Sequence, residues 1–301
     1  MHSRSFIFLP VLAAILFSLS GKKEQLLQLS KKYFPENYVL IKEYDEASIN
    51  DLAKADSPGE YISNVSTVVH EAYHDYLGRH SSYYDSAMRY RINDTLSFEV
   101  RNFKTFPSVE INNIVPAAVR KRVFRYDTYI DTKEKFHVTQ QFGILGLLEE
   151  AVAYYHSFNT EMLLFKFYKD KYGWKKPDKW MSYLGGMASF RFAITEFELF
   201  MSWYLQYAKT KHPSVYRDIM NNKGLKKLVT FLHNENRRLS LQYDKNRQEI
   251  LEQFKGTLEI HESSIFNTKT YSGSGLFDEE VKEMNLLLSK PEHHLYKDLL
   301  R

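Results

Sequence analysis

In the second half of the chain, apolar residues repeat at helical spacing almost without a break, and this pattern limits the fold more than any other feature. It starts at Glu161 and predicts helices over Asp178–Lys209, Pro213–Met220 and Gly224–Phe254. Gly185-Gly186 lies inside the first of these helices, where we expect a kink or a break. Long helices bury their apolar faces against one another, so we expect a mostly helical protein with a large core.

Shorter segments predict a small sheet beside these helices. Apolar and polar residues alternate between Thr95 and Asn112, which is typical of two strands or one bent edge strand. The apolar run Tyr38–Ile41 indicates a short buried strand, and Thr257–Phe266 indicates a late one. Ser272–Gly275 has the composition of a loop. The expected fold class is therefore α+β, predominantly helical.

Helical spacing also occurs in the first half of the chain, between the predicted strands. Three segments have it: Lys22–Phe34, Tyr61–Leu77 and Gly143–Phe158. Gly78, directly after the second segment, is a typical helix stop. We divide the chain into residues 21–160 and a helical part, residues 161–301, and expect the two to form one continuous unit.

Residues 1–20 have the pattern of a secretory signal peptide. Arg4 precedes an apolar run from Phe6 to Leu19, and Ser18-Leu19-Ser20 supplies small residues for cleavage. The run is shorter than the roughly 20 apolar residues of a membrane span. We therefore expect an exported protein without a stable membrane span after cleavage. An uncleaved signal anchor is the alternative, which Lys22-Lys23 favours because it directly follows the cleavage position.

The charge balance and the absence of cysteine exclude several classes of function. The chain has 41 Lys and Arg and 37 Asp and Glu, a net charge of +4, without a long basic stripe, so nothing indicates binding to nucleic acid. Because cysteine is absent, the chain has neither a thiol nucleophile nor a thiolate metal site. A bound metal would therefore have His and carboxylate ligands. The sequence indicates no oligomeric state.

One pentad inside a predicted helix, His70-Glu71-Ala72-Tyr73-His74, has the form His-Glu-x-x-His. Two histidines four residues apart project from one face of a helix, so both can bind the same ion. Glu71 lies on an adjacent face, from which it can reach a metal-bound water. Zinc lowers the pKa of such a water toward about 7. Glu71 would then act as general base and acid in the hydrolysis of a carbonyl compound.

A catalytic zinc site has three protein ligands and one open position. The acidic pair Glu149-Glu150 on a second predicted helix offers the third ligand. Such a pair taken alone is more typical of a charged helix face. Its combination with the upstream pentad favours a metal site instead.

The surroundings of Glu150 resemble the gluzincin branch of the zincin metallopeptidases, whose third ligand is a Glu on a second helix. The matching positions are Ala151, Ala153 and Tyr155. The resemblance implies that His70, His74 and Glu150 bind Zn²⁺ in a zincin-like core. Glu149 fits this frame less well, and we expect it to be a neighbour of the ligands.

The resemblance also suggests which residues complete the site. Some gluzincins have an acidic residue four positions after the ligand Glu, which orients a histidine. Tyr154 occupies that position here, so Asp75 or Glu149 would take this role. A developing oxyanion needs a hydrogen-bond donor, for which His137 is our candidate. In zincins a strand pairs with the extended substrate, and Phe98–Ile111 would be that strand.

The leading hypothesis is an exported zinc-dependent metallopeptidase that hydrolyses a peptide or protein substrate. The alternative is an exported helical protein that binds peptide or glycan without catalysis and has a fortuitous or decayed pentad. The two hypotheses differ in whether His70, His74 and Glu150 converge in the fold. A membrane-anchored peptidase would differ from the first hypothesis only in residues 1–23.

Overall fold

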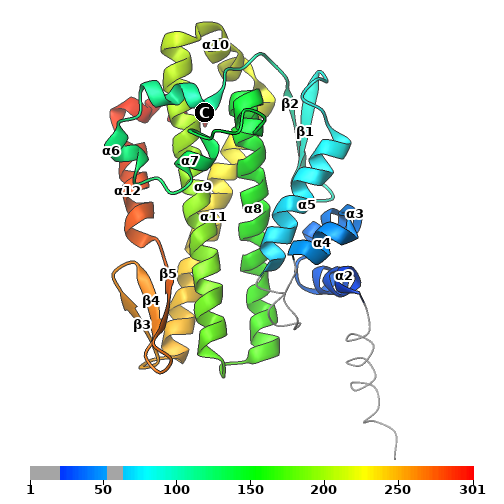
Figure 1. Ribbon diagram of the computed structural model, residues 1–301, viewed down its shortest axis with the longest axis vertical. Coiled ribbons are helices and arrows are strands. Elements are labelled where there is room, and N and C mark those ends of the chain that lie inside the picture. Colours follow the sequence, from blue (N-terminus) through cyan, green and yellow to red (C-terminus); the bar gives the residue numbers. More distant parts are fainter. Residues whose placement is uncertain (1–20, 53–63) are drawn as a thin grey trace, which may run out of the picture.

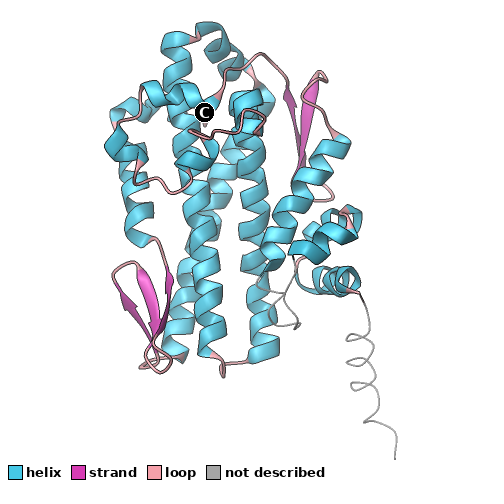
Figure 2. Cartoon of the chain, in the orientation of Figure 1, coloured by secondary structure: helices cyan, strands magenta, loops and turns pink. Residues whose placement is uncertain are grey.

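The computed structural model describes residues 21–52 and 64–301, which form a mostly helical protein with two small antiparallel sheets (Figure 1, Figure 2). The expected fold class, α+β and predominantly helical, is confirmed at this level. The expected signal peptide, residues 1–20, lies outside the described residues. None of the described helices combines the length and the apolar character that a membrane span requires.

Three long helices form the centre of the molecule and run side by side (Figure 1). They are α8 (Val138–Tyr172), α9 (Pro177–Lys211) and α11 (Lys223–Gln253), and α10 (Pro213–Asn221) connects the last two. α8 and α9 are buried around most of their circumference, as expected for helices inside a large core. The kink expected at Gly185-Gly186 is wrong, because α9 is helical throughout. Gly185 instead leaves room for Ser274 to pack against the helix.

Short helices precede α8. They are α2 (Lys22–Tyr33), η1 (Pro35–Asn37), α3 (Tyr38–Glu43), α4 (Glu46–Leu52) and α5 (Val65–His80). Of these, α2 and α5 pack against α8, and the others pack against α2, α5 or both. The strand expected over Tyr38–Ile41 is wrong. A short apolar run suits a strand or a buried helical turn equally well, and Leu40 and Ile41 are fully buried on α3. α5 continues past Gly78, because this glycine does not adopt the left-handed conformation that ends a helix.

β1 (Ala87–Arg91) and β2 (Ser97–Arg101) form an antiparallel hairpin beside α5 (Figure 1). The strand pattern expected after Pro107 is instead a 3-10 helix, η3 (Ser108–Asn113), followed by the short helices α6 (Ala117–Arg120) and α7 (Tyr126–Tyr129). Three residues, Val109 to Ile111, are too few to define a period, so the sequence pattern was ambiguous there.

The outer edge of β2 is covered by the start of α11. Asn222 Nδ2 donates to the carbonyl oxygen of Arg101 over 2.8 Å. The backbone of Gly224 packs so closely on the carbonyl of Glu99 that a side chain would not fit there. Of the segment expected to pair with an extended substrate, Phe98–Ile111, the strand part ends at Arg101 and contacts α11 at its outer edge. Such pairing requires an exposed edge, and the role of this segment stays a prediction.

A second sheet follows α11 and consists of β3 (Leu258–His261), β4 (Ser264–Asn267) and β5 (Ser272–Gly275). The single late strand expected over Thr257–Phe266 is a hairpin, and the expected loop at Ser272–Gly275 is the third strand. Gly273 lies opposite Phe266 and leaves space for its ring. The chain ends with α12 (Asp278–Ser289), η4 (Pro291–His293) and α13 (His294–Leu299).

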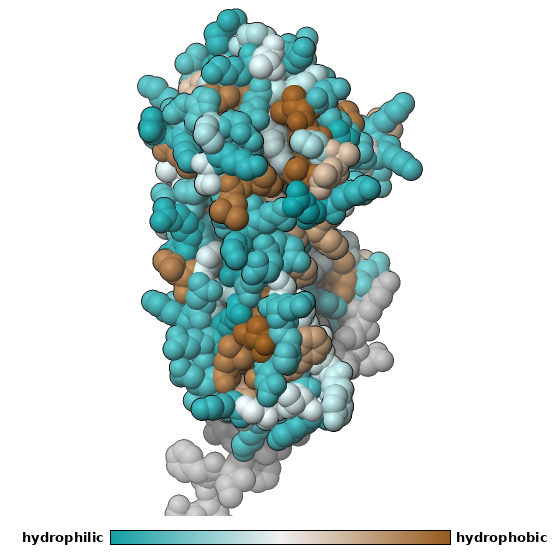
Figure 3. All heavy atoms as spheres, turned by 90° about the vertical axis from the view of Figure 1, so that its left-hand side faces the viewer, coloured by the Kyte–Doolittle hydropathy of each residue, from teal (hydrophilic) through white to brown (hydrophobic). Residues whose placement is uncertain are grey.

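The hydrophobic core is continuous through the described chain. The division expected between residues 160 and 161 lies inside α8, so the two parts share one helix and one core. The face with α6, α12 and the β3–β5 sheet is mainly hydrophilic and has separate apolar patches (Figure 3). Scattered patches of this kind are ordinary on a folded protein.

Inside this core, α8 contains an acid that makes stability depend on pH. Glu161 is buried and accepts a hydrogen bond from Ser66 Oγ over 2.5 Å. Burial raises the pKa of Glu161 to about 7, although the bond from Ser66 opposes the increase. Because this pKa exceeds that of the unfolded chain, the folded state binds the proton more tightly. The contribution of Glu161 to the free energy of unfolding therefore decreases as the pH rises from about 4.5 to about 7.

We expect the substitution Glu161→Gln to remove this loss, because the amide keeps a polar partner for Ser66 and does not ionise. Between pH 5 and pH 8 the wild type should lose about 2 to 3 kcal/mol of unfolding free energy relative to the variant. Urea unfolding at the two pH values measures the difference. Equal pH dependence in both proteins would contradict the prediction.

Candidate metal centre

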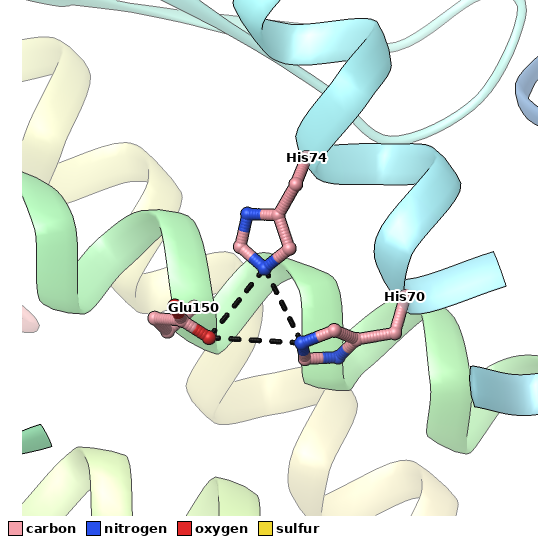
Figure 4. A group of neighbouring side chains, drawn as sticks. All are labelled: His70, His74 and Glu150. Atoms are coloured by element: carbon pink, nitrogen blue, oxygen red, sulfur yellow. Dashed lines mark hydrogen bonds and ion pairs between the residues drawn. The ribbon is translucent and has the colours of Figure 1, made fainter. Parts of the chain in front are cut away.

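α5 presents both histidines of the pentad to α8. Ser66, His70 and His74 follow one another at four-residue spacing, so they lie on one face of the helix. Ser66 shows that this face packs against α8, because its carbonyl oxygen accepts a hydrogen bond from Ser157 Oγ over 3.0 Å. Figure 4 shows both imidazoles pointing toward Glu150, which extends from α8.

The three predicted ligand atoms converge (Figure 4). His70 Nε2 and His74 Nε2 are 3.2 Å apart, and Glu150 Oε2 lies 3.6 Å from the first and 3.5 Å from the second. In a tetrahedral zinc site with bonds of about 2.0–2.1 Å, ligand atoms are separated by about 3.3–3.4 Å. The three atoms are therefore spaced as ligands of one zinc ion would be.

Glu150 Oε2 supports this interpretation independently of the spacing. The oxygen is buried and has no hydrogen-bond partner among the described residues. At 3.5–3.6 Å its contacts with the two imidazoles are ion-pair contacts rather than hydrogen bonds. A buried carboxylate oxygen without a donor is costly. A cation at the centre of the three side chains would satisfy it, so these residues fit a bound zinc ion.

A bend at the start of α8 determines which residues lie next to Glu150. Gly143 has φ +50°, and a side chain there would collide with the Phe106 carbonyl and the Tyr204 hydroxyl. Gly146 likewise leaves space for the Val138 carbonyl. The first turn of α8 is therefore bent relative to the rest of the helix. The bend places His137, the residue that caps this turn, beside the ligands.

Glu149 orients one of the histidines. His74 Nδ1 lies 2.7 Å from Glu149 Oε1, and the other oxygen of Glu149 accepts a hydrogen bond from the Tyr83 hydroxyl. A proton held on Nδ1 by a carboxylate leaves Nε2 available to a metal. Asp75, the other candidate for this role, instead accepts a hydrogen bond from Arg79 over 2.6 Å at the surface. Asp75 projects away from the histidines because it is not at four-residue spacing from them.

The carboxylates control the protonation of the site. Burial lowers the pKa of His74, but contacts with Glu149 and Glu150 outweigh burial and raise this pKa to about 10. Burial raises the pKa of Glu150, but contacts with His70 and His74 outweigh it and hold this pKa well below its usual value. The two carboxylates therefore favour a proton on His74. A divalent cation would compete with that proton.

Of the two predicted catalytic residues, His137 lies beside the ligand residues, whereas Glu71 directly follows His70 on α5. Glu71 is half-buried on α5 and forms no hydrogen bond or ion pair with another described residue. Its role as general base stays a prediction. His137 Nε2 lies 3.9 Å from Glu150 Oε1, while its Nδ1 lies 2.9 Å from Thr139 Oγ1. The structure thus brings the predicted catalytic His137 to the site and leaves one ring nitrogen facing it.

Tyr154 packs against His70 with its ring edge-on, at a centroid distance of 4.7 Å. Its hydroxyl lies 3.1 Å from the hydroxyl of Tyr129 and accepts a hydrogen bond from Arg125 Nε over 3.2 Å. Arg125 is buried and pairs with Glu196 over 2.7 Å. The ion pair fixes Arg125, which holds the Tyr154 hydroxyl in place. The Tyr154 ring in turn limits the rotation of the His70 ring.

Sequence reasoning missed three residues of this arrangement: Tyr83, Arg125 and Glu196. Tyr83 follows α5 in a loop, and the buried ion pair joins a loop residue to α9 across 71 residues of sequence. Neither contact has a spacing pattern that would predict it. The one available signal for the pair was an acid within the apolar stretch of α9, where an unpaired charge would be costly.

No protein-family model matches this chain, and no similar protein was found among curated sequences or solved structures.

Proposed function

We propose that this protein is an exported zinc-dependent metallopeptidase. The observation that carries the proposal is the convergence of His70 Nε2, His74 Nε2 and Glu150 Oε2, which has no hydrogen-bond partner among the described residues, within 3.6 Å of one another. Glu149 supports it by orienting His74. The gluzincin resemblance of the two helices supports a peptide substrate, and the pattern of residues 1–20 supports export.

In this proposal each residue has a defined task. His70, His74 and Glu150 would hold the metal, which when bound would supply a water of lowered pKa and a Lewis acid for the substrate carbonyl. Glu71 accepts the proton of the attacking water and returns it to the leaving amine. His137 donates a hydrogen bond to the carbonyl oxygen as negative charge develops on it. Tyr154 and Glu149 keep the two imidazoles in position.

The part of the fold that we propose to be zincin-like is the pair of helices α5 and α8. Both helices contribute ligands from facing sides, which is the feature that resembles gluzincins. The small β1–β2 hairpin packs beside α5, but the outer edge of its strand β2 is covered by α11. We therefore propose that the substrate enters without pairing with β2. His137 and Tyr154 then supply polar groups on the α8 side of the site.

Metal removal tests this function directly. We expect the purified protein to contain one zinc per chain and to hydrolyse a mixed peptide library, because catalytic zinc sites have three protein ligands, the number that converge here. A zinc chelator should abolish hydrolysis, and added zinc should restore it. Metal analysis and mass spectrometry of the products measure both effects. Stoichiometric zinc in a His70→Ala/His74→Ala double variant would contradict the assignment of the site.

A further inference from the structure

A separate cavity lies between the β1–β2 hairpin and the C-terminal end of α5. It has a volume of 330 Å³, within the range of small-molecule sites. Tyr76 and His80 of α5 form one wall, and Arg89 and Arg91 of β1 form another. The turn of the hairpin, including Asn93, closes the end. None of these residues is a proposed zinc ligand or contacts one through a described hydrogen bond.

Arg91 is a buried, immobilised cation in this cavity. Its side chain is 7% exposed. Both terminal nitrogens donate to the carbonyl oxygen of Glu36, and Nη2 also donates to Asp94 Oδ1 over 2.6 Å. The guanidinium lies over the ring of Tyr76 at 5.7 Å. A guanidinium held in this way is preorganised and loses little side-chain entropy when a ligand binds.

Arg89 and Asn93 supply N–H donors that no other described residue accepts. Arg89 is two residues before Arg91 on the same face of β1. It uses one of its five N–H donors, from Nε to Ser97 Oγ over 3.0 Å, and its Nη groups have no partner among the described residues. Asn93 accepts from two backbone amides of the turn through Oδ1, so Nδ2 is its remaining polar group.

The cavity therefore has an excess of donors and of positive charge. Two guanidiniums line it, whereas Asp94 is its one carboxylate among the described residues and is already paired with Arg91. His80 is paired outside the cavity wall with Glu43 over 2.7 Å. Guanidiniums recognise carboxylates and phosphates through paired N–H donors. Val39, Leu96 and Tyr76 add apolar surface beside them.

We propose that this cavity binds a small organic oxyanion, a molecule with a carboxylate or phosphate group and a short apolar part. The oxyanion accepts hydrogen bonds from Arg89 and Arg91, and the apolar part contacts Tyr76, Val39 and Leu96. The site is distinct from the metal centre and does not depend on the proposed peptidase activity.

Titration calorimetry of the purified protein tests this site with phenyl phosphate and phenylacetate as probes and with neutral benzyl alcohol as a reference. We expect saturable binding of at least one anion and none of benzyl alcohol. Arg89→Gln should weaken anion binding about tenfold or more, because it removes a charged donor. Arg89 is exposed, so this substitution should not disturb folding.

Arg101→Gln is the matched control, because Arg101 is an exposed arginine of the same hairpin that does not line the cavity. It should bind the anions as the wild type does. Preference for phenyl phosphate would identify a phosphoryl ligand, and preference for phenylacetate a carboxylate. The proposal fails if neither anion binds with a Kd below about 10 mM, which corresponds to a binding free energy near −3 kcal/mol. It also fails if Arg89→Gln and Arg101→Gln have equal effects.

Discussion

The substitution Glu71→Gln is expected to leave one zinc per chain and to lower the rate of peptide hydrolysis by about 10²–10⁴-fold. Glutamine has nearly the same shape as glutamate but cannot accept a proton from the attacking water. Glu71 does not belong to the group of converging ligand atoms, so metal binding should be unaffected. Zinc content by atomic absorption and kcat on a peptide substrate measure the two effects separately.

Asp75→Asn is the matched control for this experiment. Asp75 is an acid on the same helix, one turn after Glu71, and its carboxylate pairs with Arg79 rather than with the site. We expect this variant to keep both zinc and activity, because surface ion pairs contribute little. If Glu71→Gln hydrolyses peptides as fast as the wild type, Glu71 is not the general base.

The second large effect is expected for Glu150→Ala, which should lose stoichiometric zinc and therefore all hydrolysis. The substitution leaves two imidazoles for a metal that prefers three protein ligands and an open position. The loss of affinity should exceed the roughly 10–100-fold that removal of an outer partner costs. Zinc titration with a competing chelator measures the affinity, and circular dichroism establishes that the variant is folded.

The adjacent acid provides the control for this second prediction. Glu149→Ala removes the carboxylate that orients His74 but keeps all three ligand atoms. We expect it to weaken zinc binding by about 10–100-fold without abolishing it. Loss of zinc in Glu149→Ala together with normal zinc binding in Glu150→Ala would show that Glu149, not Glu150, is the third ligand. Glu150→Gln, which preserves side-chain volume, separates loss of the ligand from creation of a cavity.

Where helical periodicity is long, the sequence alone predicted the fold well. The segments expected over Asp178–Lys209 and Gly224–Phe254 correspond closely to α9 and α11. The secondary structure predicted for short segments was wrong. Tyr38–Ile41 is helical and Ser272–Gly275 is a strand, because four residues contain too little periodic information and their packing partners decide the conformation. The break predicted at Gly185 was also wrong. Gly185 lies within α9 and allows Ser274 to pack closely against the helix.

For the candidate site, local spacing determined one part and tertiary packing the other. The four-residue spacing of His70 and His74 places both on one face of any helix that contains them, so the sequence was sufficient for this pair. The choice of Glu150 over Glu149 as the converging acid rested on a resemblance. The structure provides its physical basis, because the rotation of α8 against α5 directs Glu150 to both Nε2 atoms and Glu149 to His74 Nδ1.

The contacts that support the site depend on tertiary structure alone. Tyr83 reaches Glu149 from a loop, Arg125 meets Glu196 on a different helix, and Arg91 reaches the carbonyl of Glu36 across 55 residues of sequence. Such pairs have no fixed sequence separation, because they depend on how whole helices and strands pack. Periodicity and spacing are local properties of the chain, so they predict which side chains share a face, whereas packing decides what that face meets.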